Sequence, residues 1–170
     1  MPHHRRLLAA GASYHVTART NRSEPIFDPR PASELFLLVL KQAHKRFAFE
    51  LPNFTIMPNH IHLLIKPSDD ESLSKIMQWI LSVFAMRWNR AHGLHGHVWG
   101  ERFFSRIISS EADWLHVFAY IDENPVRANL ASQPWLWKNG GIWQHRMGMS
   151  DIVNGLDEIV LGIFPGHRCL

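Results

Sequence analysis

Cysteine is almost absent from this 170-residue chain, whose only one is Cys169. A disulfide framework or a thiolate zinc site within one chain is therefore excluded, and a reducing cytoplasm is the expected location. The chain also lacks a hydrophobic run long enough to span a membrane, so we expect no membrane partner. Internal repeats and low-complexity tracts are missing as well, which leaves an ordinary globular protein as the expected class.

What the chain does have is enough apolar material for one sizeable core, since 46% of its residues are hydrophobic. We expect residues 1–170 to form a single domain, with a core over about 1–133 and a tryptophan- and glycine-rich C-terminal extension over 134–170. Lys and Arg number 18 against 15 Asp and Glu, and 12 histidines can add positive charge. This mildly basic balance favours a polyanionic partner.

Two kinds of apolar periodicity succeed one another along the chain, one with the period of a strand and one with that of a helix. Extended segments are predicted over 13–19, 54–57, 60–66 and 98–108. Helices are predicted from a start signal at 28–31 to residue 47, over 73–88, and from Ser110 to about Asn124, where Pro125 ends the last one. This order predicts an α+β fold, in which an antiparallel sheet has its helices packed on one face.

The most informative stretch is Met-Pro-Asn-His-Ile-His-Leu-Leu at residues 57–64. Side chains alternate faces along a strand, so His60 and His62 project to the same side, opposite an aliphatic stripe. Two imidazoles on a rigid strand can together bind one metal ion. The same pattern fits two solvated histidines on the open face of an antiparallel sheet, and the stretch alone leaves both interpretations open.

A second feature of chemical interest lies on the last predicted helix, where His116, Tyr120 and Asn124 form one stripe by their four-residue spacing. An amphipathic helix whose tyrosine extends its hydroxyl to water would give the same pattern. The chain has one other tyrosine, Tyr14, which lies on the apolar face of the first predicted strand. Tyr14 is therefore predicted to belong to the core.

Basic and aromatic side chains interleave in the segment 98–108, where Arg102, Phe104 and Arg106 fall in one alternating set. Such a set suits phosphate contacts combined with base stacking. Surface arginines beside core aromatic residues would produce the same arrangement.

In combination, these stretches resemble a known family. The stretch 57–64 is similar to the metal-binding signature of the HUH single-tyrosine transposases, and Tyr-Ile-Asp-Glu-Asn-Pro-Val-Arg-Ala at 120–128 resembles the nucleophile helix of their REP-associated branch. The opening Tyr-His-Val-Thr at 14–17 and the segment around Trp99 add to the likeness. The resemblance covers about residues 5–146, and two motifs in the right order and separation make it specific.

The resemblance implies a ferredoxin-like domain that cuts and rejoins single-stranded DNA at or near hairpin-forming repeats through a 5′-phosphotyrosine intermediate. It makes His60, His62 and Tyr120 the catalytic residues, with the histidines as metal ligands and the tyrosine as nucleophile. Asn124 becomes the third ligand, at a position where related transposases often carry glutamine. The implied cofactor is Mg²⁺ or Mn²⁺. The implied DNA-binding residues are Arg19, Asn21, Arg22, Trp99, Arg102, Phe103 and Arg106.

This assignment agrees with the chemistry that phosphodiester cleavage requires. A divalent ion held on a rigid face can neutralise the non-bridging oxygens and orient the phosphorus for in-line attack. A phenol titrates near pH 10 in water, so a tyrosine nucleophile must lose its proton as it attacks. The resulting phosphotyrosine keeps the free energy of the ester, so a free DNA hydroxyl can reverse the step.

Two other functions remain open from the residues alone. A non-catalytic protein derived from such a transposase could hold single-stranded or hairpin DNA on a basic, aromatic sheet. A metal-dependent phosphohydrolase that uses water would need the histidines but not Tyr120. Retention of His60, His62, Tyr120 and Asn124 argues against a non-catalytic protein. The sequence also leaves open whether the two motifs meet within one chain or across a homodimer.

Overall fold

The computed structural model describes residues 9, 11–28 and 30–170, so residues 1–8 of the predicted domain lie outside the described residues. Four strands form one sheet in the order β2-β3-β1-β4, and every neighbouring pair is antiparallel. The strands are β1 (Tyr14–Arg19), β2 (Phe49–Met57), β3 (His60–Pro67) and β4 (Phe104–Ile107). The three long helices are α1 (Arg30–Arg46), α2 (Leu73–His92) and α3 (Glu111–Arg127). The α+β, ferredoxin-like class predicted from the sequence is confirmed.

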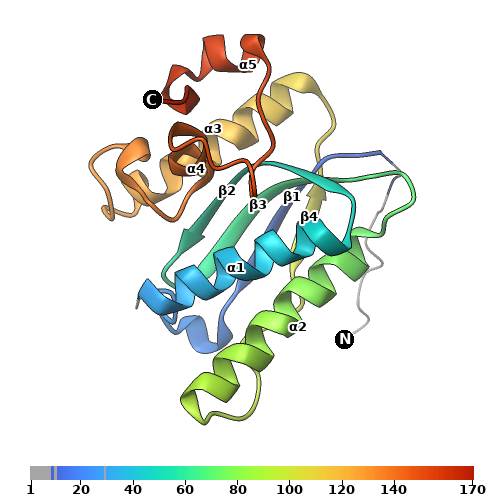
Figure 1. Cartoon of the computed structure of the whole chain (residues 1–170), viewed down its shortest axis with the longest axis vertical. Helices are drawn as coiled ribbons and strands as arrows, with labels where there is room; N and C mark the ends of the chain where they lie inside the picture. The colour runs from blue at the N-terminus through green and yellow to red at the C-terminus, as the bar shows by residue number, and fades with distance from the viewer. Residues whose placement is uncertain (1–8, 10, 29) are drawn as a thin grey trace.

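The main core lies between the sheet and the helices α1 and α2, which Figure 1 shows in front of the sheet. Alternation supplies its sheet side, because Ile61, Leu63 and Ile65 all project toward these helices. The histidines of β3 therefore project to the opposite face. Tyr14 is 2% exposed and belongs to this core, as its place in the strand predicted.

Helix α3 lies on the other face of the sheet, so packing on one face holds for α1 and α2 only. Leu64 follows the two histidines on their face, and it is fully buried in a small cluster with Val117, Phe118 and Ile121 of α3. This apolar contact holds α3 against the sheet beside the histidines, because burying Leu64 requires apolar side chains packed over it. Figure 1 shows α3 behind the sheet, on the side away from α1 and α2.

Three predicted boundaries differ from the structure. Strand β2 begins at Phe49 rather than at residue 54, and its proline falls within a register irregularity between Glu50 and Asn53, where a ladder hydrogen bond is not needed. Strand β4 is shorter than the predicted segment 98–108. Helix α3 continues through Pro125 to Arg127, because a proline in the last turn removes only one intrahelical hydrogen bond.

The start of α3 is fixed by a reciprocal cap. The Ser110 hydroxyl accepts a hydrogen bond from the Asp113 amide (3.1 Å), and the Asp113 carboxylate accepts one from the Ser109 amide (3.1 Å). The end of α2 is also well defined, since Gly93 adopts a left-handed conformation (φ 61°) that glycine tolerates without strain.

The C-terminal extension packs against α3 and β2, as Figure 1 shows at the top of the molecule. It contains η2 (Pro134–Leu136), α4 (Gly141–Arg146), α5 (Glu158–Ile163) and η3 (Pro165–His167). Gly141 lies so close to β2 that a Cβ atom there would collide with the Asn53 side chain. The described helices contain no segment with the length and apolar character that a bilayer crossing needs.

A buried polar chain ties the extension to α3. His167 is 3% exposed, and its Nε2 lies 2.7 Å from the Asp122 carboxylate. The other oxygen of that carboxylate accepts a hydrogen bond from the Asn53 amide (2.9 Å), while His167 Nδ1 lies 2.8 Å from His145 Nδ1. Helix α3 is thereby connected to β2 on one side and to the extension on the other.

Removing the His167 imidazole is expected to destabilise the fold. His167→Ala leaves a buried carboxylate oxygen without its partner, so the free energy of unfolding should fall by about 2–4 kcal/mol. Urea denaturation followed by circular dichroism measures this change. His116→Ala, which removes an exposed imidazole from α3, is the matched control and should change stability by less than about 0.5 kcal/mol. Equal effects of the two variants would contradict the role given to His167.

Candidate active site

The two histidines of β3 lie side by side, with ring centroids 4.9 Å apart, on the face that α1 and α2 leave uncovered. His60 is half-buried, whereas His62 is 5% exposed. The interpretation as two solvated histidines therefore does not hold for His62. A buried imidazole beside another imidazole indicates a preformed polar site rather than two solvent-exposed surface side chains.

A third imidazole, from the neighbouring strand, joins this pair. His15 of β1 is stacked on His62 with ring centroids 5.2 Å apart, and its Nε2 lies 3.0 Å from His62 Nδ1. The Thr17 hydroxyl lies 3.1 Å from the same nitrogen. The sequence analysis missed both residues as site residues. Their polar alternation in 14–19 was the available signal, but it became informative only once β1 was known to pair with β3.

Hydrogen bonds orient the imidazoles so that, among the residues that the structure describes, Nε2 of each β3 histidine has no hydrogen-bond partner. The Asn59 amide donates to the Ser23 carbonyl (3.3 Å), which turns its oxygen toward His60 Nδ1 at 2.6 Å. An acceptor at Nδ1 requires a proton there, so the lone pair of His60 lies on Nε2. His62 likewise uses Nδ1 for its contacts with β1. In the tautomer that carries the proton on Nδ1, the Nε2 atom of each histidine can act as a ligand.

Burial keeps these imidazoles neutral at physiological pH. It lowers the pKa of His15 to about 4, with Arg106 as a further cause, and that of His60 to about 4, with Arg19 as a further cause. The pKa of His62 falls to about 3, first through burial and then through His60, His15 and Arg19. Neutral imidazoles present lone pairs rather than positive charge, which is the state in which histidine binds a metal.

Tyr120 lies against this cluster. Its ring is edge-on to His62, with centroids 5.6 Å apart at 90°, and edge-on to His15 at 5.8 Å. The Arg127 guanidinium lies 5.8 Å from the centre of the same ring. The two sequence motifs therefore meet within a single chain, because the packing of α3 on the histidine face brings residue 120 to strands β1 and β3.

Asn124 lies one helical turn after Tyr120 and is half-buried. Its amide nitrogen donates to the Tyr120 carbonyl (2.8 Å), which leaves its carbonyl oxygen as an acceptor or ligand atom. His116, at the other end of the predicted stripe, is exposed. Of the three residues of the stripe, Tyr120 and Asn124 are half-buried, whereas His116 faces solvent.

Most of the predicted DNA-binding residues gather beyond the end of β1. Arg19 is exposed and pairs across the strands with His60. Asn21 and Arg22 follow in η1 (Asn21–Ser23), and the loop before β4 runs beside them through a bridge between Thr20 and Trp99. Exposed Arg102 and half-buried Trp99 both line a cavity of about 630 Å³ at this place.

One of the predicted DNA contacts needs correction. Phe103 is 7% exposed and lies in the core shared with α1 and α2, so its ring is not available for base stacking. Its neighbour Phe104 is 64% exposed on the histidine face. Arg106 is on that face too, and its contact with DNA stays a prediction; its guanidinium forms a bidentate ion pair with Asp113 (2.8 and 3.0 Å), which raises the Arg106 pKa. Strand register decides these outcomes, because neighbouring residues point to opposite faces.

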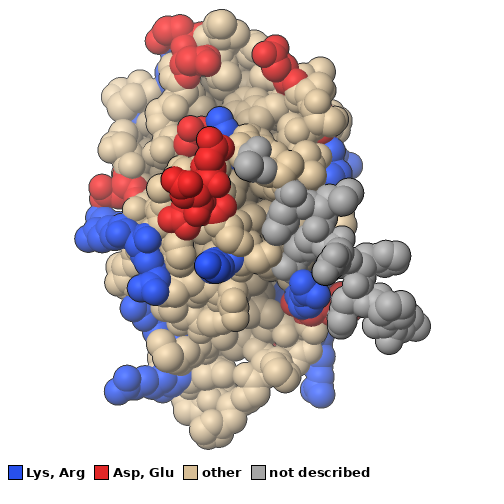
Figure 2. Space-filling model, turned by 90° about the vertical axis from the view of Figure 1, so that its right-hand side faces the viewer, with Lys and Arg blue, Asp and Glu red and all other residues tan. Residues whose placement is uncertain are grey.

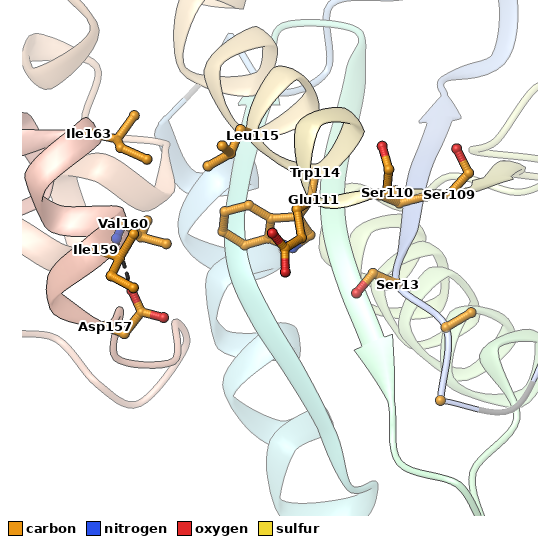
Figure 3. A pocket seen from close by; sticks show the side chains of 13 residues that line it. Ser13, Ser109, Ser110, Glu111, Trp114, Leu115, Asp157, Ile159, Val160 and Ile163 are labelled. Atoms are coloured by element: carbon orange, nitrogen blue, oxygen red, sulfur yellow. Dashed lines mark hydrogen bonds between the residues drawn. The ribbon is translucent and has the colours of Figure 1, made fainter.

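A separate cavity of about 560 Å³ lies at the start of α3, where Figure 3 shows Trp114 between α5 and the serine-rich end of β4. Ser13, Ser109 and Ser110 line one side, and Ile159 and Ile163 of α5 line the other. The histidines and Tyr120 are not among its lining residues.

Figure 2 shows that on one face of the molecule acidic side chains lie mainly in the upper half and basic ones in the lower half.

The lowered histidine pKa values predict a loss of stability in acid. An ordinary histidine titrates at 6.5, so between about pH 4 and 6.5 the unfolded chain binds more protons than the folded chain. The contribution of these histidines to the free energy of unfolding is complete above pH 6.5. On acidification below that pH, the free energy of unfolding should fall by up to about 1.4 kcal/mol per pH unit for each histidine. His62→Gln should reduce this slope, whereas His116→Gln, at an exposed position, should not. Urea denaturation at several pH values tests this, and an unchanged slope in His62→Gln would contradict it.

Several known proteins are similar to this chain in sequence or in fold. Residues 9–124 match the family model described as "Transposase IS200 like". A candidate REP-associated tyrosine transposase of Haemophilus influenzae is 26% identical over 102 residues, which cover 54% of this chain and 58% of that protein. The chain thus spans less than two thirds of that relative's length.

Two solved structures share the fold. One is a REP-associated tyrosine transposase bound to a REP hairpin, with a TM-score of 0.74 and 22% identity, covering 92% of this chain and 93% of that one. The other is a candidate transposase from Deinococcus radiodurans, with a TM-score of 0.50 and 19% identity, covering 72% of this chain and 97% of that one. Because the family match extends over more than half of the sequence, the chain belongs to the IS200-like transposase family.

Proposed function

We propose that this chain cleaves and rejoins single-stranded DNA at or near hairpin-forming repeats through a 5′-phosphotyrosine formed by Tyr120. The observation that carries the proposal is the edge-on contact between Tyr120 and His62, at 5.6 Å between ring centroids, within one chain. It places a nucleophile candidate beside a ligand candidate, as in-line attack on a bound phosphate requires. The similar solved structure, which holds a REP hairpin, supports a hairpin-bearing DNA as the substrate class.

The donor set fits a divalent metal ion. His60 and His62 are neutral and each keeps Nε2 free, and the Asn124 oxygen is the third ligand that we propose. Among the residues that the structure describes, no group of three or more His, Cys, Asp or Glu side chains is arranged to hold a metal. Two imidazoles and an amide oxygen suit Mn²⁺ better than Mg²⁺, because imidazole is a softer ligand than Mg²⁺ prefers. When bound, the ion would neutralise the non-bridging oxygens of the scissile phosphate.

The residues of the chain set the conditions for attack. A phenol must lose its proton, and the adjoining His15 and His62 are weak bases because burial lowers their pKa to about 4 and about 3. We therefore expect the proton to leave to water at the half-buried phenol oxygen. The Arg127 guanidinium beside the ring stabilises the negative charge that develops on this oxygen.

Phosphate contacts come from the exposed arginines around the site. Arg19 lies across from His60, and Arg22 and Arg102 belong to the two segments that meet beyond β1. Guanidinium groups bind phosphate oxygens in a bidentate manner, which positions a strand without reading its sequence. These contacts would guide the DNA backbone toward Tyr120.

Tyr120→Phe is expected to abolish the covalent protein–DNA adduct, because the attacking oxygen is lost. The half-buried position should keep the change in stability within about 1 kcal/mol. End-labelled hairpin DNA, incubated with each variant and Mn²⁺, is analysed by denaturing gel and peptide mapping. Tyr14→Phe is the matched control: its hydroxyl donates to the Ala9 carbonyl (2.9 Å), so the variant loses stability but keeps the adduct.

Each outcome of that experiment separates the candidate functions. An adduct that persists in Tyr120→Phe, or that maps to another residue, would overturn the proposed mechanism. DNA binding by wild type without any adduct would identify a non-catalytic DNA-binding derivative of a transposase. DNA cleavage by Tyr120→Phe without an adduct would indicate a phosphohydrolase that uses water.

Metal binding should depend on the two β3 histidines. His60→Ala and His62→Ala each remove one ligand of a small site, so calorimetric Mn²⁺ affinity and adduct yield should both fall at least about tenfold. Asn124→Ala should have a smaller effect, because a neutral amide oxygen is more easily replaced by water. His116→Ala, at an exposed position on the same helix as Asn124, is the control and should bind Mn²⁺ like wild type. Adduct formation unaffected by chelator would show that no metal is needed.

A further inference from the structure

The side chain of Phe104 stands out on the histidine face of the sheet. It is 64% exposed, and it is the only phenylalanine among the described residues that is more than a third exposed. Within the described part of the chain, no aromatic ring is stacked on it. It also belongs to the edge strand β4, where an exposed apolar ring invites aggregation unless it has a use.

Register places Phe104 in line with the candidate active site. It pairs across the strands with Thr17, and Thr17 pairs with His62, so the three residues form one row on one face. Two strand spacings separate Phe104 from His62, which is about 10 Å between their Cα atoms. The Thr17 hydroxyl, between them, lies 3.1 Å from His62 Nδ1. A strand bound at the histidines would therefore pass next to the Phe104 ring.

The surroundings of Phe104 favour a nucleic acid over an apolar partner. Helix α3 begins beside Arg106 and, among the described residues, packs mainly over β2 and β3 rather than over β4. Arg106 lies on the same face two residues away, and its side chain is 43% exposed although its guanidinium is paired with Asp113. An aromatic ring flanked by arginine on a flat sheet provides a stacking surface for a base beside a cation for its phosphate.

We propose that Phe104 is a stacking platform for an unpaired nucleobase next to the scissile phosphate. This inference rests on the proposed function and adds to it a binding residue on the open sheet face. Every base has a π-face, so the platform contributes affinity and position without sequence preference. Phe103, the residue before β4, cannot take this part, because its side chain is buried in the core.

The test compares Phe104→Ala, Phe104→Leu and Phe104→Trp by fluorescence anisotropy with oligo(dT) and with a hairpin oligonucleotide that has single-stranded flanks. All are made in a Tyr120→Phe background, which prevents adduct formation and isolates binding. Loss of one stacked base predicts a dissociation constant about 5- to 100-fold higher in Phe104→Ala and Phe104→Leu, and near the background value in Phe104→Trp. Leu38→Ala, which removes an exposed apolar side chain from α1 on the other side of the sheet, is the matched control and should not weaken binding.

An abasic scan of the unpaired flank locates the stacked base. In the Phe104-containing protein one abasic position should weaken binding, and in Phe104→Ala that penalty should disappear. Unchanged affinity in Phe104→Ala, or a penalty that remains, would overturn the inference even if the wild-type protein forms the Tyr120 adduct. Conversely, a lost penalty in a protein whose wild type forms no adduct would leave the platform standing and refute only the cleavage mechanism.

Discussion

The pairing of β1 with β3 is the constraint on which the candidate site depends. Its antiparallel register places Thr17 opposite His62 and Arg19 opposite His60, and it brings His15 within 3.0 Å of His62. These contacts join residues nearly fifty positions apart in the sequence. A shift of one residue would turn every β1 side chain to the opposite face and would replace polar partners with core residues. Burial of Tyr14, Val16 and Ala18 therefore fixes the strand register, and this register in turn places His15, Thr17 and Arg19 beside the β3 histidines.

Burial of three imidazoles beside one another opposes their protonation. The pKa of each is lowered to about 4 or about 3, chiefly by loss of hydration. The cluster thus remains uncharged near neutral pH, although arginines surround it. This state suits ligand binding, since protonated imidazoles have no free lone pair. Burial of the imidazoles would then account both for the expected loss of stability in acid and for their neutral, ligand-ready state at neutral pH.

The position of Tyr120 depends on how α3 is held against the sheet. An apolar contact through Leu64 and a polar contact from Asn53 to Asp122 bind this helix to β3 and β2. The C-terminal extension adds the buried His167, whose imidazole contacts the same Asp122 carboxylate two residues after Tyr120. The extension is therefore connected to α3, the helix that carries Tyr120, through the buried side chain of His167.

Much of this protein can be predicted from its sequence, because some patterns are local. The alternation around residues 57–66 places His60 and His62 on one face whatever their partners, and the four-residue spacing of Tyr120 and Asn124 does the same on a helix. The element order predicts the α+β class, and the likeness of the two motifs indicates the family.

Other features were decided only by the tertiary structure. His15 and Thr17 became part of the site through strand pairing, which no local pattern specifies. Alternation had already separated Phe104 from Phe103, but only the pairing of β4 with β1 decided that the set with Phe104 faces the histidines while Phe103 lies in the core. The position of α3 on the histidine face came from burial of Leu64. Sequence periodicity tells which side chains share a face, but only the packing of distant segments decides what that face meets.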